Sequence, residues 1–224
     1  LLKQIGNRKK NIKKVQTIYN GLEYQFWNSE LISEDQINTI KKKYHLNNHF
    51  TCFAWGRPGE SKGFEYLIQA LQAVVKIIPT TKLLLLFGST EQYPKKYQEL
   101  INLIQKLNLV DYIEILPKCS QEELRTYIKT VDCVVVPSKA EGFGYTTVET
   151  NAIGTPIVVS NAGSLSEVVS GKHQIFQSKN AADLAQKIIM IHNKEYLEIK
   201  SKKFEWKESV EKYLAVYQRL IKKN

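Results

Sequence analysis

No run of apolar residues in this 224-residue chain approaches the roughly 20 that a membrane-spanning helix needs. The chain also opens without an initiator methionine and without a signal-peptide pattern, so we expect a piece of a longer protein. Cysteine is scarce: Cys52, Cys119 and Cys133 are an odd number, and two of them fall inside predicted strands. This usage is typical of free thiols in a reducing compartment, so we expect a cytoplasmic protein.

Several catalytic signatures are missing as well. No Gly-x-Gly-x-x-Gly follows a predicted strand, which argues against a dinucleotide-dependent dehydrogenase. No Walker-type glycine loop ends in Lys-Ser or Lys-Thr, which argues against an NTPase, and no Ser-His-Asp elbow is visible. No Asp-x-Asp pair sits at a strand end to hold Mg²⁺ or Mn²⁺ against a diphosphate. We therefore predict an activity that needs no metal and no cofactor.

Two histidines are spaced four residues apart, His45 and His49, as they are in some helical metal sites. Asn47-Asn48 lies between them, and a strand is predicted to follow at once. Because a turn at this point breaks the helical spacing, we do not expect a metal to be bound there.

The net charge of +10 is concentrated at the start of the chain. The first fourteen residues carry six positive charges and no acid, and removing them leaves +4 for the rest. Such a run is commonly a solvated segment. A functional alternative is attraction to anionic lipid at the inner face of the membrane. Because no aromatic residue interleaves this run, binding of nucleic acid is not expected.

Short apolar runs alternate with helix-length periodic segments along most of the chain. This alternation predicts a parallel sheet with helices on both faces, in which ligands bind beyond the carboxyl ends of the strands. Strands are expected at 15–19, 50–55, 82–87, 112–116, 133–136, 156–160 and near Ile175. Helices are expected at 33–44, 64–78, 95–107, 145–154, 164–169 and 181–192, with one more capped by Ser120 and Glu123. Residues 204–220 form a predicted amphipathic C-terminal helix.

The stretch from Ser138 to Glu149 carries the strongest chemical signal. It follows the buried strand at 133–136, and Gly142 and Gly144 then allow a tight turn and a close approach to a ligand. A helix begins next, at about Tyr145. A strand, a glycine turn and a helix start together form an anion site, because free N–H groups and the helix dipole point at it.

Two carboxylates distinguish this turn from a simple phosphate site. Glu141 lies in the turn, and Glu149 follows eight residues later inside the predicted helix. A carboxylate accepts hydrogen bonds from a vicinal diol and repels phosphate. The combination suits a nucleotide sugar better than a bare phosphate.

Loops after other predicted strands offer further candidates. The loop after residues 50–55 contains Gly56, Arg57 and Lys62, which can grip a diphosphate and stabilise the charge of a leaving group; the alternative is a flexible basic loop. Gly88 either lets a ligand approach or forms a strand-end turn. The backbone near Lys118 either meets a base edge or belongs to a plain loop.

At these residues the sequence resembles the C-terminal, donor-binding domain of retaining glycosyltransferases of the GT-B fold, the glycosyl transferases group 1 family. The similarity covers residues 15–217 in the family's order. It rests on Tyr19-Asn20-Gly21, Gly56-Arg57 with Lys62-Gly63, Pro137-Ser138, the Glu-x7-Glu pair Glu141 and Glu149, Gly154-x-Pro156 and Glu167-Val168-Val169.

The resemblance implies a Rossmann-like half of a GT-B fold and assigns roles to its residues. Arg57 and Lys62 would hold the donor diphosphate, and Glu149 would take the ribose hydroxyls. Glu141, Arg57 and Lys62 are the implied catalytic residues. The implied substrate-binding residues are Gly56, Gly88, Lys118, Ser138, Gly142, Phe143, Gly144, Tyr145 and Glu149. The donor would be a UDP- or GDP-linked sugar. Transfer would retain the anomeric configuration, by front-face attack with help from the leaving phosphate.

One departure from the family limits these expectations: the N-terminal domain, which carries most of the acceptor site and catalytic groups, is missing. We expect residues 1–20 to be its tail and linker, 21–200 the donor-binding domain and 201–224 the C-terminal helix. The fragment should bind the donor, a hexose nucleotide, without transferring it to a glycan, glycolipid or glycoprotein. Two alternatives remain open: a nucleotide-sugar 2-epimerase of the same fold, and a non-catalytic nucleotide- or nucleic-acid-binding module.

Overall fold

A computed structural model describes residues 15–221, so the basic segment at the start of the chain lies outside the described residues. The chain divides into two compact units, which are treated separately below. The sheet unit is Trp27–Lys202. The terminal unit combines Leu1–Phe26 with Lys203–Asn224. The functional division at residues 20 and 200 stays a prediction.

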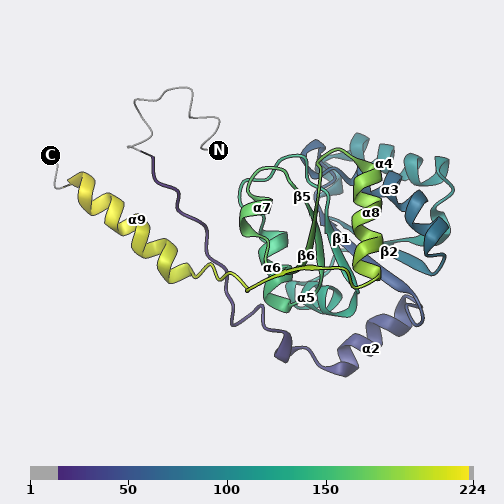
Figure 1. The fold of residues 1–224 in the computed structure, drawn as a ribbon, viewed down its shortest axis with the longest axis horizontal. Coiled ribbons are helices and arrows are strands. Elements are labelled where there is room, and N and C mark those ends of the chain that lie inside the picture. The colour runs from purple at the N-terminus through teal and green to yellow at the C-terminus, as the bar shows by residue number, and fades with distance from the viewer. Residues whose placement is uncertain (1–14, 222–224) are drawn as a thin grey trace. The chain divides into compact units, whose positions relative to one another are not determined.

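The sheet unit is built on a seven-stranded sheet in the order β3-β2-β1-β4-β5-β6-β7 (Figure 1). The strands are β1 Phe50–Gly56, β2 Thr81–Phe87, β3 Ile113–Leu116, β4 Cys133–Val136, β5 Ile157–Ser160, β6 Gly171–Phe176 and β7 Leu197–Ile199. All pairs are parallel except β6 with β7. The predicted parallel sheet is confirmed. The edge strand β7 was not predicted, because it is only three residues long and exposed throughout.

Burial explains why the strand sequences read as continuous apolar runs. Every residue of β4 and of β5 is buried, so both faces of the sheet are covered at its centre. Cys52 and Cys133 lie in register on neighbouring strands, and both are buried free thiols. Cys119 is a free thiol as well, in agreement with the predicted absence of a disulfide framework.

Two layers of helices cover the sheet (Figure 1). One layer places α3 between α4 and α8, and in the other α5 contacts α2 and α6, which in turn contacts α7. The helices are α2 Glu34–Lys43, α3 Phe64–Ile77, α4 Pro94–Lys106, α5 Gln121–Thr130, α6 Tyr145–Ile153, α7 Leu165–Val168 and α8 Ala181–His192. Short 3-10 turns occur at Ser29–Leu31, Glu60–Lys62, Thr90–Gln92 and Val110–Tyr112. Each predicted helix of this unit is present within one or two residues of its expected bounds.

Local capping fixes where these helices begin and end. Ser120 and Glu123 form the predicted capping box of α5, and Ser33 forms another with Gln36 at the start of α2. Helix α6 ends at Gly154, whose φ of 87° is a conformation that glycine adopts without strain.

The terminal unit contains the predicted C-terminal helix, α9 Trp206–Ile221. The apolar side chains of Tyr213, Leu214 and Tyr217 on this helix are about half exposed. The strand predicted at 15–19 is wrong. These residues join no ladder, and pairing in this segment is limited to an isolated parallel bridge between Leu22 and Glu205.

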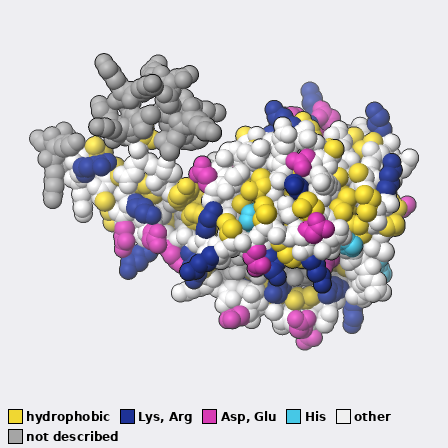
Figure 2. All heavy atoms as spheres, viewed as in Figure 1, with side chains coloured by type: hydrophobic (Ala, Val, Ile, Leu, Met, Phe, Trp, Pro, Cys, Tyr) yellow, Lys and Arg dark blue, Asp and Glu magenta, His cyan; other side chains and the backbone are white. Residues whose placement is uncertain are grey.

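The sequence raises two expectations about membranes: the absence of a membrane-spanning helix and an attraction to anionic lipid. No helix within residues 15–221 is long and apolar enough to cross a membrane. On the face of the sheet unit drawn in Figure 2, basic and acidic side chains are interspersed. The predicted attraction to anionic lipid rests on the first fourteen residues, which lie outside the described part of the chain.

Candidate functional site

The strand order reverses between β1 and β4. From β1 the chain winds outward through β2 and β3, and from β4 it winds the other way through β5 and β6. Open α/β sheets bind ligands at such a switch point, beyond the carboxyl ends of the strands. Two loops meet there, called here the β1 loop (residues 57–63) and the β4 loop (residues 137–144). Both loops carry residues that the sequence analysis singled out.

An ion pair joins the two loops. The Lys62 ammonium lies 2.7 Å from Oε2 of Glu141, and the two side chains are 22% and 17% exposed. The Ser138 hydroxyl donates to the same carboxylate oxygen at 3.4 Å. Because these groups are largely withdrawn from solvent, their attraction is screened less than that of a surface pair. The structure therefore brings together three of the predicted site residues.

Close backbone contact holds the β1 loop against the β4 loop. The N–H group of Lys139 donates to the carbonyl oxygen of Ser61 at 2.7 Å. Gly63 has a φ of 67°, and a Cβ atom added to it would lie 2.1 Å from the carbonyl oxygen of Pro137. Only glycine fits this position, both for its conformation and for its space.

The loop after β5 supports the β4 loop from its other side. A Cβ atom on Gly163 would lie 2.1 Å from the carbonyl oxygen of Glu141, and Ser164 donates its N–H group to the same oxygen at 3.4 Å. The Ser160 hydroxyl donates to the carbonyl oxygen of Ser138 at 2.5 Å. Glu141 is thus fixed through its backbone as well as through its side chain.

Helix α6 begins directly after the β4 loop. Gly144 caps it with a φ of 91° and accepts hydrogen bonds from the N–H groups of Thr147 and Val148. Within residues 15–221, no backbone carbonyl accepts a hydrogen bond from the N–H group of Gly144 or of Tyr145. These amides lie at the start of a helix, where the sequence predicted an anion site, and that site stays a prediction.

Glu149 lies one turn further along α6 and is largely buried. Burial raises the pKa of its carboxyl to about 7, while the positive charge of Lys62 acts to lower it. Lys62 therefore interacts electrostatically with both carboxylates of the predicted pair. A group that titrates near neutral pH in such a setting is common in functional sites.

The other predicted residues differ in how firmly they are held. Gly56 has a φ of 146° and accepts the N–H group of Gly88 at 3.0 Å, which joins the loops after β1 and β2. A Cβ atom on Gly88 or Gly142 would meet nothing within 4 Å, so packing does not require glycine there.

Arg57 is exposed and forms no ion pair with any residue between 15 and 221. Lys118 is exposed too, 3.8 Å from Glu91.

Side chains around the pair that sequence reasoning missed are Lys139, Glu60 and Glu65. The Lys139 ammonium lies 2.8 Å from Glu65 and 3.1 Å from Glu60. Their one signal in the sequence is that acids flank Lys62 while a lysine precedes Glu141. That alternation suggests pairing only once the two loops are known to touch.

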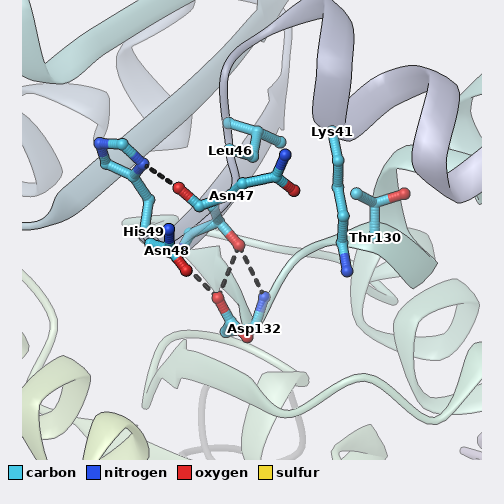
Figure 3. A pocket seen from close by; sticks show the side chains of 8 residues that line it. Lys41, Leu46, Asn47, Asn48, His49, Thr130 and Asp132 are labelled. Carbon is cyan, nitrogen blue, oxygen red and sulfur yellow. Dashed lines mark hydrogen bonds between the residues drawn. The ribbon is translucent and has the colours of Figure 1, made fainter.

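A cavity of about 150 Å³ opens at the opposite edge of the sheet, beside the amino ends of β1 and β4 (Figure 3). There the Asp132 carboxylate accepts from the N–H group and the hydroxyl of Thr51 at 2.8 and 2.7 Å. The His49 ring nitrogen Nδ1 lies 2.9 Å from the carbonyl oxygen of Asn47. Because these polar groups already bond within the fold, we place the candidate site at the other edge. No cluster of three or more metal-ligating side chains was found within residues 15–221.

Comparison with known proteins identifies the family. The model of the family described as glycosyl transferases group 1 matches residues 35–212, most of the chain. This chain belongs to that family. The family resemblance and the Rossmann-like half of a GT-B fold, which the sequence predicted, are both confirmed.

Relatives of this family member are longer than the chain itself. It is 31% identical over 162 residues to an uncharacterized glycosyltransferase of Methanocaldococcus jannaschii, covering 72% of this chain and 40% of that protein. It is 29% identical over 161 residues to the D-inositol 3-phosphate glycosyltransferase of Mycolicibacterium smegmatis, covering 67% of this chain and 36% of that protein. The match thus covers well under half the length of each of these relatives.

The fold is also found in a solved structure. The crystal structure of HepE from Anabaena, in complex with UDP-glucose, matches with a TM-score of 0.69 and 23% identity. The match covers 80% of this chain and 48% of HepE. At this identity the likeness establishes the fold alone.

Proposed function

We propose that this chain is the donor-binding half of a retaining glycosyltransferase. It binds a nucleotide sugar, from which the whole protein transfers a hexose to a glycan, glycolipid or glycoprotein acceptor without a metal. The observation that carries the proposal is the Lys62–Glu141 ion pair at the switch point, beside the start of α6. Support also comes from the family, from the UDP-glucose bound to HepE and from the inositol phosphate glycosyltransferase among the relatives.

A diphosphate fits the positive side of this site. The amides of Gly144 and Tyr145 and the dipole of α6 attract an anion, and Lys62 adds a full charge beside them. Arg57 is exposed at the start of the β1 loop and can swing to a phosphate as a bidentate donor. A leaving nucleoside diphosphate gains negative charge during transfer, so cations fixed in advance lower the barrier.

A ribose and a hexose fit the two carboxylates. Glu149 accepts hydrogen bonds from the ribose diol in its ionised form, and Glu141 is fixed by Ser138 and by Gly163 at the sugar end. When a diphosphate arrives, Lys62 can turn from Glu141 to the phosphate, which frees the carboxylate for sugar hydroxyls. The exposed loop around Lys118 is the remaining place for the base.

The chain acts on its own only as a binding unit in this proposal. The match covers 40% and 36% of two of its relatives, and we propose that the remainder of the whole protein supplies the acceptor site and further catalytic groups. The isolated chain is therefore expected to bind donor and to show little or no transfer.

Calorimetric titration of the chain with UDP, GDP and ADP in the presence of EDTA tests the proposal. One nucleotide should bind with a base preference, and Glu149→Ala and Arg57→Ala should each weaken it. Lys129→Ala removes an exposed lysine of α5, away from both loops, and serves as the charge control. Nucleotide binding that is unchanged in both site variants would show that Glu149 and Arg57 do not form the binding site. Binding that falls steeply with salt and ignores Glu149→Ala would favour a nucleic-acid module instead.

A further inference from the structure

A second set of contacts crosses between the two loops in the opposite sense to the Lys62–Glu141 pair. Lys139, in the β4 loop, directs its ammonium to Glu60 in the β1 loop at 3.1 Å and to Glu65 in the first turn of α3 at 2.8 Å. Each loop thus sends one lysine to an acid on the other side.

Of the two contacts that Lys139 makes, the one with Glu65 is the more buried, because the side chain of Glu60 is 73% exposed. The side chains of Lys139 and Glu65 are 18% and 19% exposed, and Oε2 of Glu65 is buried without a hydrogen-bond partner within residues 15–221. Removing the lysine would leave a largely buried carboxylate without its ion pair and with only the more distant charge of Lys96 acting on it, which is unfavourable. The Glu65 carboxylate would then have to move toward water or draw in another cation.

The backbone couples this side chain to Lys62. The N–H group of Lys139 donates to the carbonyl oxygen of Ser61, the residue directly before Lys62. Both residues that Lys139 contacts in the β1 loop, Glu60 and Ser61, belong to the 3-10 turn Glu60–Lys62. A shift of this turn therefore moves the Lys62 ammonium relative to α6.

Lys96 provides a natural comparison. Its ammonium also pairs with Glu60, at 3.0 Å, and its side chain is as buried as that of Lys139, at 19% exposed. Lys96 comes from α4, however, and its other ion pair is with Glu99 on the same helix. It contributes a similar charge to the same acid without linking the β1 loop to the β4 loop.

We propose that Lys139 is a positioning residue for the donor diphosphate: it fastens the β1 loop to the β4 loop so that Lys62 faces the start of α6. The proposal rests on the proposed function, because it assigns Lys62 to the diphosphate. Lys139 itself pairs with Glu60 and Glu65 and acts through the loop. It also keeps these two acids from competing with the phosphate for Lys62.

Calorimetry on Lys139→Met and Lys139→Arg tests this role, with UDP, GDP, ADP and the corresponding monophosphates as probes. Lys139→Met should weaken binding of the preferred diphosphate by roughly tenfold and change binding of its monophosphate by less than about twofold. Lys139→Arg keeps the charge and the reach, so it should restore most of the affinity. A purely structural role would weaken both nucleotides alike, which would overturn the proposal.

Two further variants separate positioning from simple charge. Lys96→Met removes a comparably buried lysine from the same acid and should change diphosphate affinity by less than about twofold. Equal losses for Lys96→Met and Lys139→Met would overturn the proposal. Lys62→Met with Lys139→Met should bind no more weakly than Lys62→Met alone, because Lys139 acts through Lys62.

Hydrogen exchange of the chain without nucleotide gives a readout that does not depend on binding. Lys139→Met should speed exchange of the backbone amides in residues 57–63, whereas Lys139→Arg and Lys96→Met should not. Unchanged exchange in that loop would overturn the proposal whatever the nucleotide result. If the unsubstituted chain binds none of the nucleotides, the proposed function fails and the donor role of Lys139 fails with it. Faster exchange seen only in Lys139→Met would then show that Lys139 holds the β1 loop in place but has no role in binding a donor nucleotide.

Discussion

Lys62 and Glu141 are 79 residues apart in the chain, yet their charged atoms lie 2.7 Å from one another. The contact exists because parallel strands β1 and β4 are neighbours and deliver their following loops to one edge of the sheet. If Lys62 binds the donor diphosphate, as we propose, the phosphate has to take the place of Glu141 beside the lysine.

Replacing Lys62 by methionine should weaken nucleoside diphosphate binding by more than tenfold. The variant removes the cation beside α6 and leaves Glu141, which is 17% exposed, as an unpaired negative charge facing the phosphate. Calorimetry measures the loss, and Lys129→Met in α5 is the matched control. Affinity within about twofold of the unsubstituted chain would rule out Lys62 as a diphosphate ligand.

Binding of a nucleotide sugar should strengthen as the pH rises toward 7. The pKa of the Glu149 carboxyl is raised to about 7 by burial, and only its ionised form accepts both hydrogen bonds of the ribose diol. Below that pH the affinity should fall by about tenfold for each pH unit, and above it the affinity should level off. Titration with UDP-glucose and GDP-mannose avoids the terminal phosphate of free diphosphates, which itself titrates near pH 6.

Glu149→Gln provides the control for that pH profile. The amide does not ionise, so the affinity of this variant should be lower and nearly constant between about pH 5 and pH 8. A slope that persists in the variant would mean that another group governs the profile.

The same carboxyl should make folding stability depend on pH. Because its folded pKa is raised above the ordinary value of 4.5, the native state holds the proton more tightly than the unfolded state between those two values. The free energy of unfolding should therefore fall as the pH rises from about 4.5 to about 7, and then stay level. Relative to the unsubstituted chain, Glu149→Gln should gain ~2–3 kcal/mol between pH 4.5 and pH 8, measured by urea unfolding. An equal effect of the substitution at both pH values would contradict the raised pKa.

Replacement by alanine should lower the stability of the fold at Gly63 but not at Gly142. Gly63→Ala forces a positive φ on alanine and drives its Cβ atom to 2.1 Å from the carbonyl oxygen of Pro137, so it should destabilise the fold by more than about 1 kcal/mol. Gly142→Ala meets nothing within 4 Å and should leave the unfolding free energy within about 0.5 kcal/mol. If the donor approaches the backbone there, Gly142→Ala should still weaken nucleotide binding. Thermal unfolding and calorimetry on both variants separate a glycine that the fold needs from one that a ligand needs.

Much of the fold could be predicted because its signals are local. Buried strands such as β4 are short apolar runs, and capping pairs such as Ser120 with Glu123 mark where helices begin. The two wrong or missing strand predictions also have a physical cause. The segment 15–19 has a strand-like sequence but no ladder partner, and β7 is too short and too exposed to stand out. A strand is defined by its neighbour, which a local pattern does not contain.

For the candidate site, too, some features could be predicted from the sequence and others needed the tertiary structure. The residue types at Arg57, Lys62, Glu141 and Glu149, and their places just after strands or at a helix start, could be read from the sequence. The sequence alone determined the alternation of strands and helices, because periodicity and capping are properties of neighbouring residues. Only the tertiary structure decided that Lys62 meets Glu141 and that Lys139 fastens their loops. It also decided that Glu149 titrates near neutral pH. These facts depend on burial and on distances between residues far apart in the chain, and both arise only when the sheet is assembled.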